Sequence, residues 1–226
     1  MKNLEIYIHI PFCVRKCEYC DFLSFPADDD AKLRYVKGLM AEMIFYGPLM
    51  KNYQVSSVYI GGGTPSSIDE QWIAALMEGV FDCFNVLPDA EISIECNPGT
   101  LSREKLLAYK DAGINRLSIG LQSANNDELK RLGRIHTFEQ FVTNYEVARN
   151  VGFKNINVDL MYGLPEQSAS QYMATVNKII RLHPDHISAY SLIVEKGTPF
   201  YEKYKFDMVR QEAGMGTEFL PDEDEL

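Results

Sequence analysis

The segment Cys13-Val14-Arg15-Lys16-Cys17-Glu18-Tyr19-Cys20 places three thiols in the pattern C-x3-C-x2-C. A segment this short cannot form a core of its own, but it can wrap three sulfurs around one small inorganic group. Structural zinc usually has four protein ligands in closely matched pairs, and no obvious fourth ligand accompanies these cysteines. Three thiolates suit a four-iron cluster whose fourth iron stays open for another ligand. The pattern favours such a cluster, with a zinc clip or a redox CxxC as alternatives.

The residues just before the cysteines have the pattern of a β-strand. From Leu4 to Ile10 the apolar side chains occupy even positions and the polar ones odd positions, which is the period of a strand with two unlike faces. Pro11 follows and ends the strand. The cysteines therefore begin a loop at the carboxyl end of the first strand.

Strand-like and helix-like segments alternate along the rest of the chain. The patterns predict strands at 4–10, 57–60, 91–95, 116–122, 155–159 and 186–193, and helices near 31–46, 69–84, 102–112, 125–132, 137–151 and 168–181. Repeated alternation favours parallel β/α units over hairpins. We therefore predict an α/β fold, a partial parallel (β/α)6 barrel.

Three of these strands have one polar and one apolar face. The polar sets are Glu91, Ser93 and Glu95; Ser118, Gly120 and Gln122; and Asn155, Asn157 and Asp159. Because helices must cover the apolar faces, the polar faces should point into the lumen of the barrel. Glu95, Gln122 and Asp159 lie at the carboxyl ends, where barrels have their active sites. The alternative is that these side chains cap helices or satisfy loop backbone; their common register favours a binding cavity.

A glycine-rich turn, Gly61-Gly62-Gly63-Thr64-Pro65, follows the second strand directly. Consecutive glycines allow the backbone to approach a ligand closely and leave N–H groups free to bind anions. Such turns are common, so the turn gains meaning from its place beside the cysteine loop.

Length and composition are those of an ordinary globular protein. A chain of 226 residues can bury one large core as a single domain. The net charge of −10, from 32 acidic and 22 basic residues, disfavours nucleic acid as a partner. No apolar run approaches the roughly 18 residues of a membrane span, and Glu5 and His9 interrupt the first strand too early for a signal peptide. We expect a cytoplasmic protein without a transmembrane segment.

The remaining cysteines and histidines carry weaker signals. Five cysteines, three of them in one loop, are poorly explained by disulfides. We interpret Cys83 and Cys96 as packing residues. Residues His136, His183 and His186 match no metal-binding spacing and are expected at the surface or hydrogen-bonded. His9 lies on the polar face of the first strand beside the cysteine loop, where it could orient a ligand.

The first motif also identifies a family. Tyr7-x-His9-Ile10-Pro11-Phe12-Cys13-x3-Cys17-x-Tyr19-Cys20 strongly resembles the radical S-adenosylmethionine (SAM) superfamily, in the branch related to oxygen-independent coproporphyrinogen III oxidase. The resemblance implies a partial barrel of the radical SAM type. It also implies a [4Fe-4S] cluster held by Cys13, Cys17 and Cys20, with SAM on the open iron, and radical chemistry that starts from SAM.

The resemblance extends from residue 4 to about residue 200 and implies further SAM contacts. Tyr7 and Tyr19 would flank the cluster and SAM, and Gly62, Gly63 and Thr64, in the GGGTP form of this branch, would contact the methionine part. The other implied contacts are Glu95 in IECNP, Gln122, Arg134 in LGR, Asp159 in DLMYGLP, and Ile193 near the adenine.

One position distinguishes two functions within this branch. The oxidase has a further cysteine two positions after the third cluster cysteine, and here Phe22 occupies that place. Cys20-Asp21-Phe22 instead resembles the HemW-type heme chaperones. The resemblance therefore implies a protein that binds heme as cargo and delivers it to heme-accepting proteins, and it is compatible with a homodimer. The alternative is a radical SAM oxidoreductase, the oxidase that decarboxylates coproporphyrinogen III to protoporphyrinogen IX, so enzymatic activity stays open.

The resemblance also predicts how the chain is divided. Residues 1–200 would form the radical SAM partial barrel, and residues 201–226 the truncated start of a carboxyl-terminal region with an acidic end. The carboxyl-terminal domain of the relatives would then be absent or truncated. Leu220 to Leu226 has the proline and acids of a first helical turn, with an acidic tail as the alternative.

Overall fold

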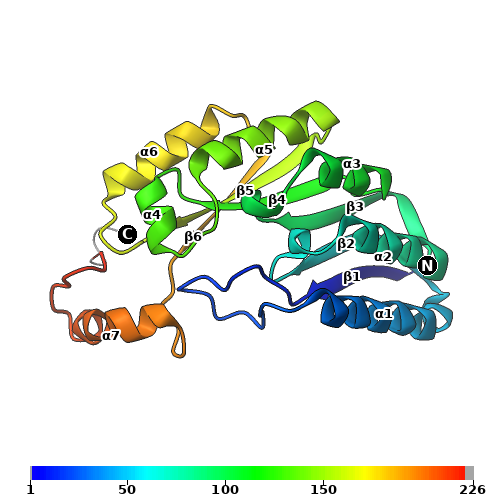
Figure 1. Cartoon of the computed structure of the whole chain (residues 1–226), viewed down its shortest axis with the longest axis horizontal. Helices are drawn as coiled ribbons and strands as arrows, with labels where there is room; N and C mark the ends of the chain where they lie inside the picture. The colour runs from blue at the N-terminus through cyan, green and yellow to red at the C-terminus, as the bar shows by residue number, and fades with distance from the viewer. Residues whose placement is uncertain (1, 222–226) are drawn as a thin grey trace.

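The computed structural model describes residues 2–221, which form one curved sheet covered by helices (Figure 1). Six parallel strands lie side by side in chain order. They are β1 (Lys2–Ile10), β2 (Tyr53–Gly62), β3 (Val86–Cys96), β4 (Arg116–Gln122), β5 (Asn155–Tyr162) and β6 (His186–Ser191). The predicted partial (β/α)6 barrel is confirmed. The strand predicted at 186–193 ends two residues earlier, and β2 and β3 extend beyond the predicted ranges at both ends.

The helices follow the strands as β/α units require. They are α1 (Asp29–Tyr46), α2 (Glu70–Cys83), α3 (Arg103–Asp111), α4 (Asn126–Arg131), α5 (Phe138–Val151), α6 (Ala169–Ile180) and α7 (Pro199–Glu212), with short 3-10 turns at Gly47–Met50, Pro65–Ser67 and Pro98–Thr100. Side-chain caps explain where several of them begin. The carboxylate of Asp28 accepts from the amide of Ala31, and Thr137 and Ser168 form capping boxes.

The core lies between the sheet and the helices. Alternate residues of the strands, such as Ile60, Ile94 and Val158, are fully buried, and so are Leu76 of α2 and Phe141 of α5. Fully burying one such side chain contributes about 1.5–3 kcal/mol relative to leaving it exposed. The period-two alternation therefore fixes which strand face the helices cover, and it leaves the other face to the lumen.

Strand register aligns the polar lumen residues in two neighbouring rows across the sheet. Glu95 is paired with Ser118 and Ser118 with Asn157, and in the next row Gly120 is paired with Asp159 and Asp159 with Ser188. Side chains from four neighbouring strands thus meet near the carboxyl ends, on the side where the loops after β1 and β2 also lie.

Helix α7 was not predicted, and it carries a second, smaller hydrophobic cluster. Phe200 and Tyr204 of α7 pack with Leu132, Met161 and Leu164 of the barrel. The predicted division of the chain at residue 200 stays a prediction; α7 spans that position. The helix start predicted at 220–226 falls mostly on residues outside the described range.

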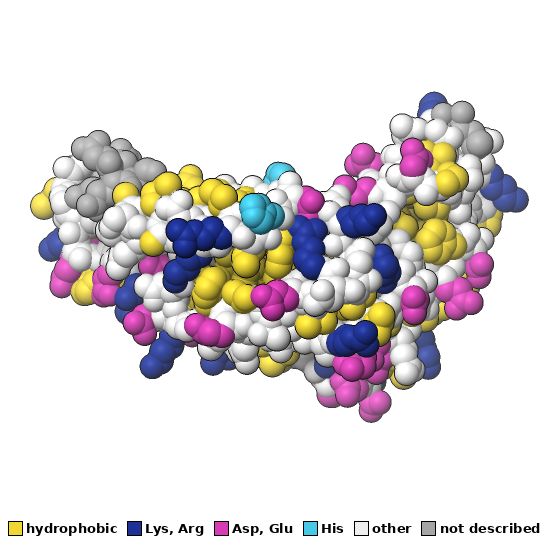
Figure 2. All heavy atoms as spheres, turned by 90° about the horizontal axis from the view of Figure 1, so that it is seen from above, with side chains coloured by type: hydrophobic (Ala, Val, Ile, Leu, Met, Phe, Trp, Pro, Cys, Tyr) yellow, Lys and Arg dark blue, Asp and Glu magenta, His cyan; other side chains and the backbone are white. Residues whose placement is uncertain are grey.

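The surface has two further features. Within residues 2–221, no helix combines the length and the hydropathy that a membrane crossing requires. Seen from above, basic and acidic side chains are interspersed over the face, and the outline is concave along one side (Figure 2).

Candidate functional site

The cysteine loop connects β1 to α1 and is fixed by backbone hydrogen bonds to distant parts of the chain. The amide of Glu18 donates to the carbonyl of Leu132 (3.1 Å), and the carbonyl of Glu18 accepts from the amide of Phe200 at the start of α7 (3.0 Å). The guanidinium of Arg15 donates to the carbonyl of Gly133 (2.7 Å). The loop is therefore positioned from both sides, although its own sequence has no regular secondary structure.

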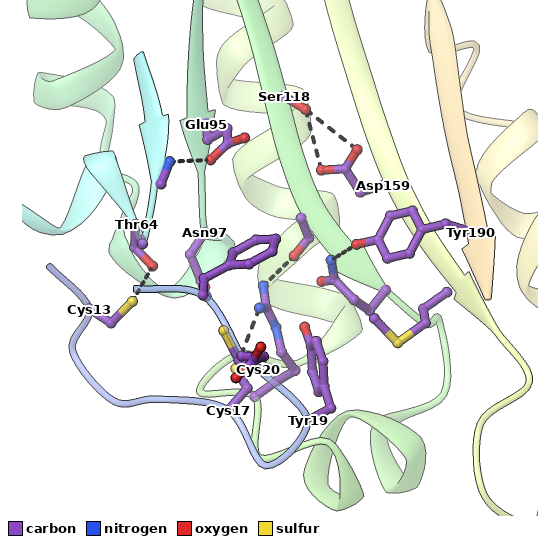
Figure 3. Close-up of a pocket in the computed structure, with 18 of the residues that line it drawn as sticks. Cys13, Cys17, Tyr19, Cys20, Thr64, Glu95, Asn97, Ser118, Asp159 and Tyr190 are labelled. Atoms are coloured by element: carbon purple, nitrogen blue, oxygen red, sulfur yellow. Dashed lines mark hydrogen bonds between the residues drawn. The ribbon is translucent and has the colours of Figure 1, made fainter. Parts of the chain in front are cut away.

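The loop covers the carboxyl ends of the strands and encloses a cavity of about 660 Å³ (Figure 3). This volume lies in the usual range of small-molecule and cofactor sites. All three loop cysteines line the cavity, each with a free, half-buried thiol. The wall is completed by side chains from β2 to β6 and from the glycine-rich turn.

Two partly buried carboxylates face this cavity. Glu95 accepts from the hydroxyl of Tyr59 (2.8 Å) and from the amide of Gly62 (3.0 Å). Asp159 accepts from the hydroxyl of Ser118 (3.3 Å) and from the amide nitrogen of Asn157 (2.7 Å). Burial is the main cause that raises the pKa of both carboxyls above their ordinary values. A cationic ligand in the cavity would stabilise their ionised forms.

The glycine-rich turn allows the closest approach of backbone to the cysteine loop. Gly62 has a left-handed backbone (φ +118°), a conformation that side chains with a Cβ rarely adopt. A Cβ at Gly63 would lie 2.8 Å from the carbonyl oxygen of Phe12 and 3.0 Å from Sγ of Cys13. The hydroxyl of Thr64 donates to Sγ of Cys13 at 3.4 Å. The turn thus contacts the first cysteine directly.

Arg134 and Gln122 approach the cavity from its other side. Arg134 Nη1 lies 3.7 Å from Sγ of Cys17, and Nη2 donates to the carbonyl of Gly120 (2.5 Å). Gln122 adopts a positive φ of 71°, which is unusual for a residue other than glycine and typical of functional sites. Its Nε2 donates to the hydroxyl of Tyr190 (3.0 Å).

Unpartnered buried polar atoms indicate where a ligand fits. Within the described residues, Gln122 Oε1 and Arg134 Nε are buried without a hydrogen-bond partner, and both side chains line the cavity. Buried polar groups are normally satisfied, so a polar ligand would complete this site. The cavity offers it both acceptors and donors.

The thiols fit a cluster by their chemistry. Arg134 places a positive charge 3.7 Å from Sγ of Cys17, and Thr64 donates to Sγ of Cys13, so both sulfurs have neighbours that complement an anionic cluster. Among residues 2–221, no three His, Cys, Asp or Glu side chains come close enough together to hold a single metal ion. Holding a shared group would therefore require the cysteine side chains to turn toward a common centre, which a loop without regular secondary structure allows.

The structure brings together most of the site residues predicted from the sequence. Those that line the cavity are Cys13, Cys17, Cys20, Tyr19, Gly62, Gly63, Thr64, Glu95, Gln122, Arg134, Asp159 and Ile193. Tyr7 is not among them. Its hydroxyl pairs with Nδ1 of His9 (2.9 Å), its ring packs against Tyr59, and its side chain is 58% exposed. The individual cofactor contacts stay predictions.

Several cavity residues were missed by the sequence reasoning. They are Tyr59, Arg116, Ser188 and Tyr190, which line the cavity from β2, β4 and β6. The alternation that identified Glu95 and Asp159 would also have found Ser188 and Tyr190, because both lie on the lumen face of β6. Tyr59 could have been found by its place in the sheet, because it pairs with Ser93 on the polar face of β3.

The other cysteines and histidines mostly behave as expected. Cys96 is buried in the core, and Cys83 packs against the core, so both are packing residues as predicted. His183 is exposed, and Nδ1 of His186 pairs with Oδ1 of Asn157 (2.6 Å). The expectation for His136 was wrong. It is 4% exposed, and neither ring nitrogen has a hydrogen-bond partner among the described residues.

Burial beneath the end of β4 explains the state of His136. Burial, helped by the nearby Arg134 cation, lowers the pKa of its imidazole to about 3. His136 therefore stays neutral at neutral pH. No sequence pattern around His136 indicates this burial.

Residues 7–179 match the sequence family described as the Radical SAM superfamily. The chain belongs to this superfamily. Among curated proteins, it is 38% identical to heme chaperone HemW of Escherichia coli (strain K12) over 99% of this chain and 56% of that protein. It is 40% identical to heme chaperone HemW of Bacillus subtilis (strain 168) over 86% of this chain and 52% of that protein. The chain thus spans about half the length of these curated relatives.

Solved structures share the fold of this chain. Coproporphyrinogen III oxidase (HemN) from Escherichia coli, a radical SAM enzyme, superposes with a TM-score of 0.80 and 27% identity over 99% of this chain and 56% of that one. Methylornithine synthase (PylB) superposes with a TM-score of 0.61 at 14% identity over 88% of this chain and 56% of that one. The second likeness concerns the fold alone.

Proposed function

We propose that this chain is the cluster- and SAM-binding part of a HemW-type heme chaperone, which binds heme and delivers it to acceptor proteins. Relatives named heme chaperone match nearly the whole chain. The observation that carries the proposal is Phe22, which replaces the additional cysteine of the oxidase. Phe22 lines the cavity and is 67% exposed. The chain therefore has an apolar side chain at the position where the oxidase has a thiol.

The residues of the cavity have separate roles in this proposal. Cys13, Cys17 and Cys20 would hold the [4Fe-4S] cluster, and Gly62, Gly63, Thr64, Glu95, Gln122, Arg134, Asp159 and Ile193 would contact SAM. When bound, the two cofactors supply one-electron chemistry that no side chain can provide. The protein's own contribution is to bind and orient them.

Charge is the main means of that orientation. Arg134, 3.7 Å from Sγ of Cys17, places a positive charge beside the anionic cluster that the cysteines would hold. Glu95, fixed by Tyr59 and Gly62, offers a buried negative charge to the cationic groups of SAM. Asp159, held by Ser118 and Asn157, adds a second one. Interactions between charges are stronger in such a cavity than in water.

A second function is favoured by the same cofactor-binding set. The likeness to coproporphyrinogen III oxidase, with all predicted cofactor residues present, is compatible with oxidative decarboxylation of a porphyrinogen. Phe22 argues against this function, since the thiol that distinguishes the oxidase is missing.

One experiment separates the two functions. The protein is reconstituted anaerobically with iron and sulfide and supplied with SAM, a low-potential reductant and coproporphyrinogen III, and protoporphyrinogen is sought by chromatography. The same sample is titrated with hemin. Stoichiometric hemin uptake without product supports the chaperone, whereas formation of protoporphyrinogen would contradict it and establish the oxidase.

A further inference from the structure

The segment after the last cluster cysteine exposes an unusual number of large apolar side chains. Phe22 is 67% exposed, Leu23 84% and Phe25 53%. Together with Lys16 they form what we call the loop face. Single exposed apolar residues are normal, but adjacent ones on one segment mark binding surfaces.

This exposure is built into the backbone of the loop. The amide of Ser24 donates to the carbonyl of Phe22 (2.7 Å), and Ser24 itself is buried. The amide of Phe25 donates to the carbonyl of Pro11 (2.9 Å), and its carbonyl accepts from the amide of Cys13 (3.2 Å). The turn at Ser24 is thus anchored to the end of β1. The backbone that carries the exposed side chains of Phe22, Leu23 and Phe25 is therefore held by hydrogen bonds.

Lys16 supplies a positive charge at the edge of the loop face. The loop face adjoins the cavity. The ammonium of Lys16 donates to the carbonyl of Phe22 at 3.0 Å. Both residues also line the cavity. The acidic neighbour Asp21 lines the cavity too, and it is the one group of the segment that would repel a carboxylate. A ligand suited to this surface is flat and apolar and carries negative charge at its rim.

We propose that the loop face is where heme docks, with the macrocycle against Phe22 and Leu23 and a propionate on Lys16. This inference rests on the proposed chaperone function and names the heme site within it. Heme matches the chemistry because its macrocycle is planar and apolar, whereas its two propionates are anionic. Aromatic side chains contribute large apolar contact area to such a ligand, and an exposed ammonium contributes a charge-assisted hydrogen bond.

The position next to the cavity has a functional consequence. A macrocycle on Phe22 lies beside the predicted cluster and SAM site, since Phe22 belongs to both the loop face and the cavity wall. Occupation of the cavity therefore affects the wall against which heme packs. Cofactor binding and heme binding are expected to be coupled through this one side chain.

The test is hemin titration of the anaerobically reconstituted protein, followed by absorbance in the Soret region. Phe22→Ser and Leu23→Ser should each raise the Kd for hemin at least about tenfold, in line with the loss of a buried aromatic or aliphatic anchor. Lys16→Glu should also weaken binding, and Asp21→Asn should leave it equal or tighter. Leu23 does not line the cavity, so Leu23→Ser reports on heme docking even if Phe22→Ser disturbs cluster assembly.

Phe45 provides a matched control. It is also a phenylalanine with 67% exposure, but it lies at the end of α1, which runs from the cysteine loop back toward the other end of the strands (Figure 1). Phe45→Ser should leave the Kd for hemin unchanged. Equal affinities for the wild type, Phe22→Ser and Leu23→Ser would overturn the inference and leave the chaperone function standing.

Two further outcomes are decisive. If the wild type takes up no hemin, the proposed function fails and the inference fails with it. If Leu23→Ser abolishes self-association in a sizing column but leaves the hemin Kd unchanged, the loop face binds a second copy of the chain, and the inference is overturned.

Discussion

Glu95 shows how single residues set the chemistry of the cavity. Its two carboxylate oxygens already accept from Tyr59 and Gly62, which fixes the side chain before any ligand arrives. Burial nevertheless raises its pKa, because desolvation outweighs these two donors. A buried carboxylate in this state favours a ligand that brings positive charge.

This pKa shift predicts a pH dependence for SAM binding. Protonation of Glu95 in the free protein begins at a higher pH than for an exposed glutamate, whose ordinary value is 4.5. SAM keeps its cationic groups as Glu95 is protonated, so its affinity should fall as the pH is lowered from neutrality through this raised pKa. Below the raised pKa, the fall should approach about tenfold per pH unit. Isothermal titration calorimetry of the reconstituted protein measures the affinity for SAM at each pH, and the absorbance of the cluster is recorded alongside.

Glu95→Gln should weaken SAM binding at pH 7.5 and flatten the pH dependence. Glu91→Gln is the matched control, since Glu91 lies on the same face of β3 outside the cavity. An affinity that changes with pH in the same way in wild type and Glu95→Gln would remove Glu95 from the site.

Cluster assembly should depend on the thiols of the loop and not on those of the core. Cys17→Ala is expected to lose most of the bound iron and the visible absorption of the cluster. The barrel should stay folded, because Cys17 lies in a loop outside the core. Cys83→Ala is the control and should keep both. Full iron content and unchanged absorption in Cys17→Ala, with an unaltered far-ultraviolet circular dichroism spectrum, would disprove the ligand assignment.

At the scale of elements, the glycine-rich turn after β2 is the most constrained part of the site. Gly62 combines a left-handed backbone with close neighbours, since a Cβ there would lie 2.7 Å from the His9 ring and 3.0 Å from the carbonyl oxygen of Ile10. Gly62→Ala should lower the free energy of unfolding by about 1–3 kcal/mol and weaken SAM binding. Urea denaturation of the apoprotein measures the first effect.

Gly38 gives the opposite expectation and serves as the control. It lies on the exposed face of α1, and nothing outside its own stretch of helix comes within 4 Å of the place that a Cβ would occupy. Gly38→Ala should raise the free energy of unfolding by about 0.5–1 kcal/mol, because alanine favours the helix. Equal effects of the two substitutions would show that the turn imposes no special constraint.

The elements differ in how well their sequence predicts them. Strong alternation, as in Leu4 to Ile10, predicts the strands. The place of Glu95, Gln122 and Asp159 at the carboxyl ends of polar strand faces predicts a common cavity, although the structure does not pair these three residues in register. Helix α7 was missed because its burial depends on Leu132 and Met161, which are distant in the sequence. The left-handed backbone of Gln122 and the burial of His136 could also not be predicted from the sequence. Both depend on how the end of β4 meets the following loop.

At the scale of the whole molecule, segments that are distant in the sequence position the cysteine loop. Glu18 bonds both to the turn after α4 and to the start of α7. The segment that follows α7 is bound to this helix. The carboxylate of Asp207 accepts from the amides of Glu218, Phe219 and Leu220 (3.1, 2.7 and 3.1 Å). The loop therefore depends on packing that spans nearly the full described chain.

Asp207 should hold the segment that follows α7 in place. Burial opposes its ionisation, but the three amide donors outweigh this and lower its pKa below the ordinary value of 3.8. Its stabilising effect is present above that value and is lost as the pH falls through the lowered pKa. In Asp207→Asn, one oxygen becomes an amide nitrogen, so amides 218–220 should exchange hydrogen faster at pH 7.

Hydrogen exchange followed by mass spectrometry measures this effect. Asp82→Asn, which changes an exposed aspartate of α2, should leave the exchange of 218–220 unchanged. Unaltered protection of these amides in Asp207→Asn would contradict the role of the carboxylate.

The proposed function requires that one cavity hold a [4Fe-4S] cluster on three cysteines and SAM at the open position. Electron paramagnetic resonance of the reduced, reconstituted protein before and after addition of SAM tests this directly. We expect a four-iron signal whose g values change on adding SAM and which is absent from Cys17→Ala. A signal that SAM leaves unchanged, or one that Cys17→Ala retains, would contradict it.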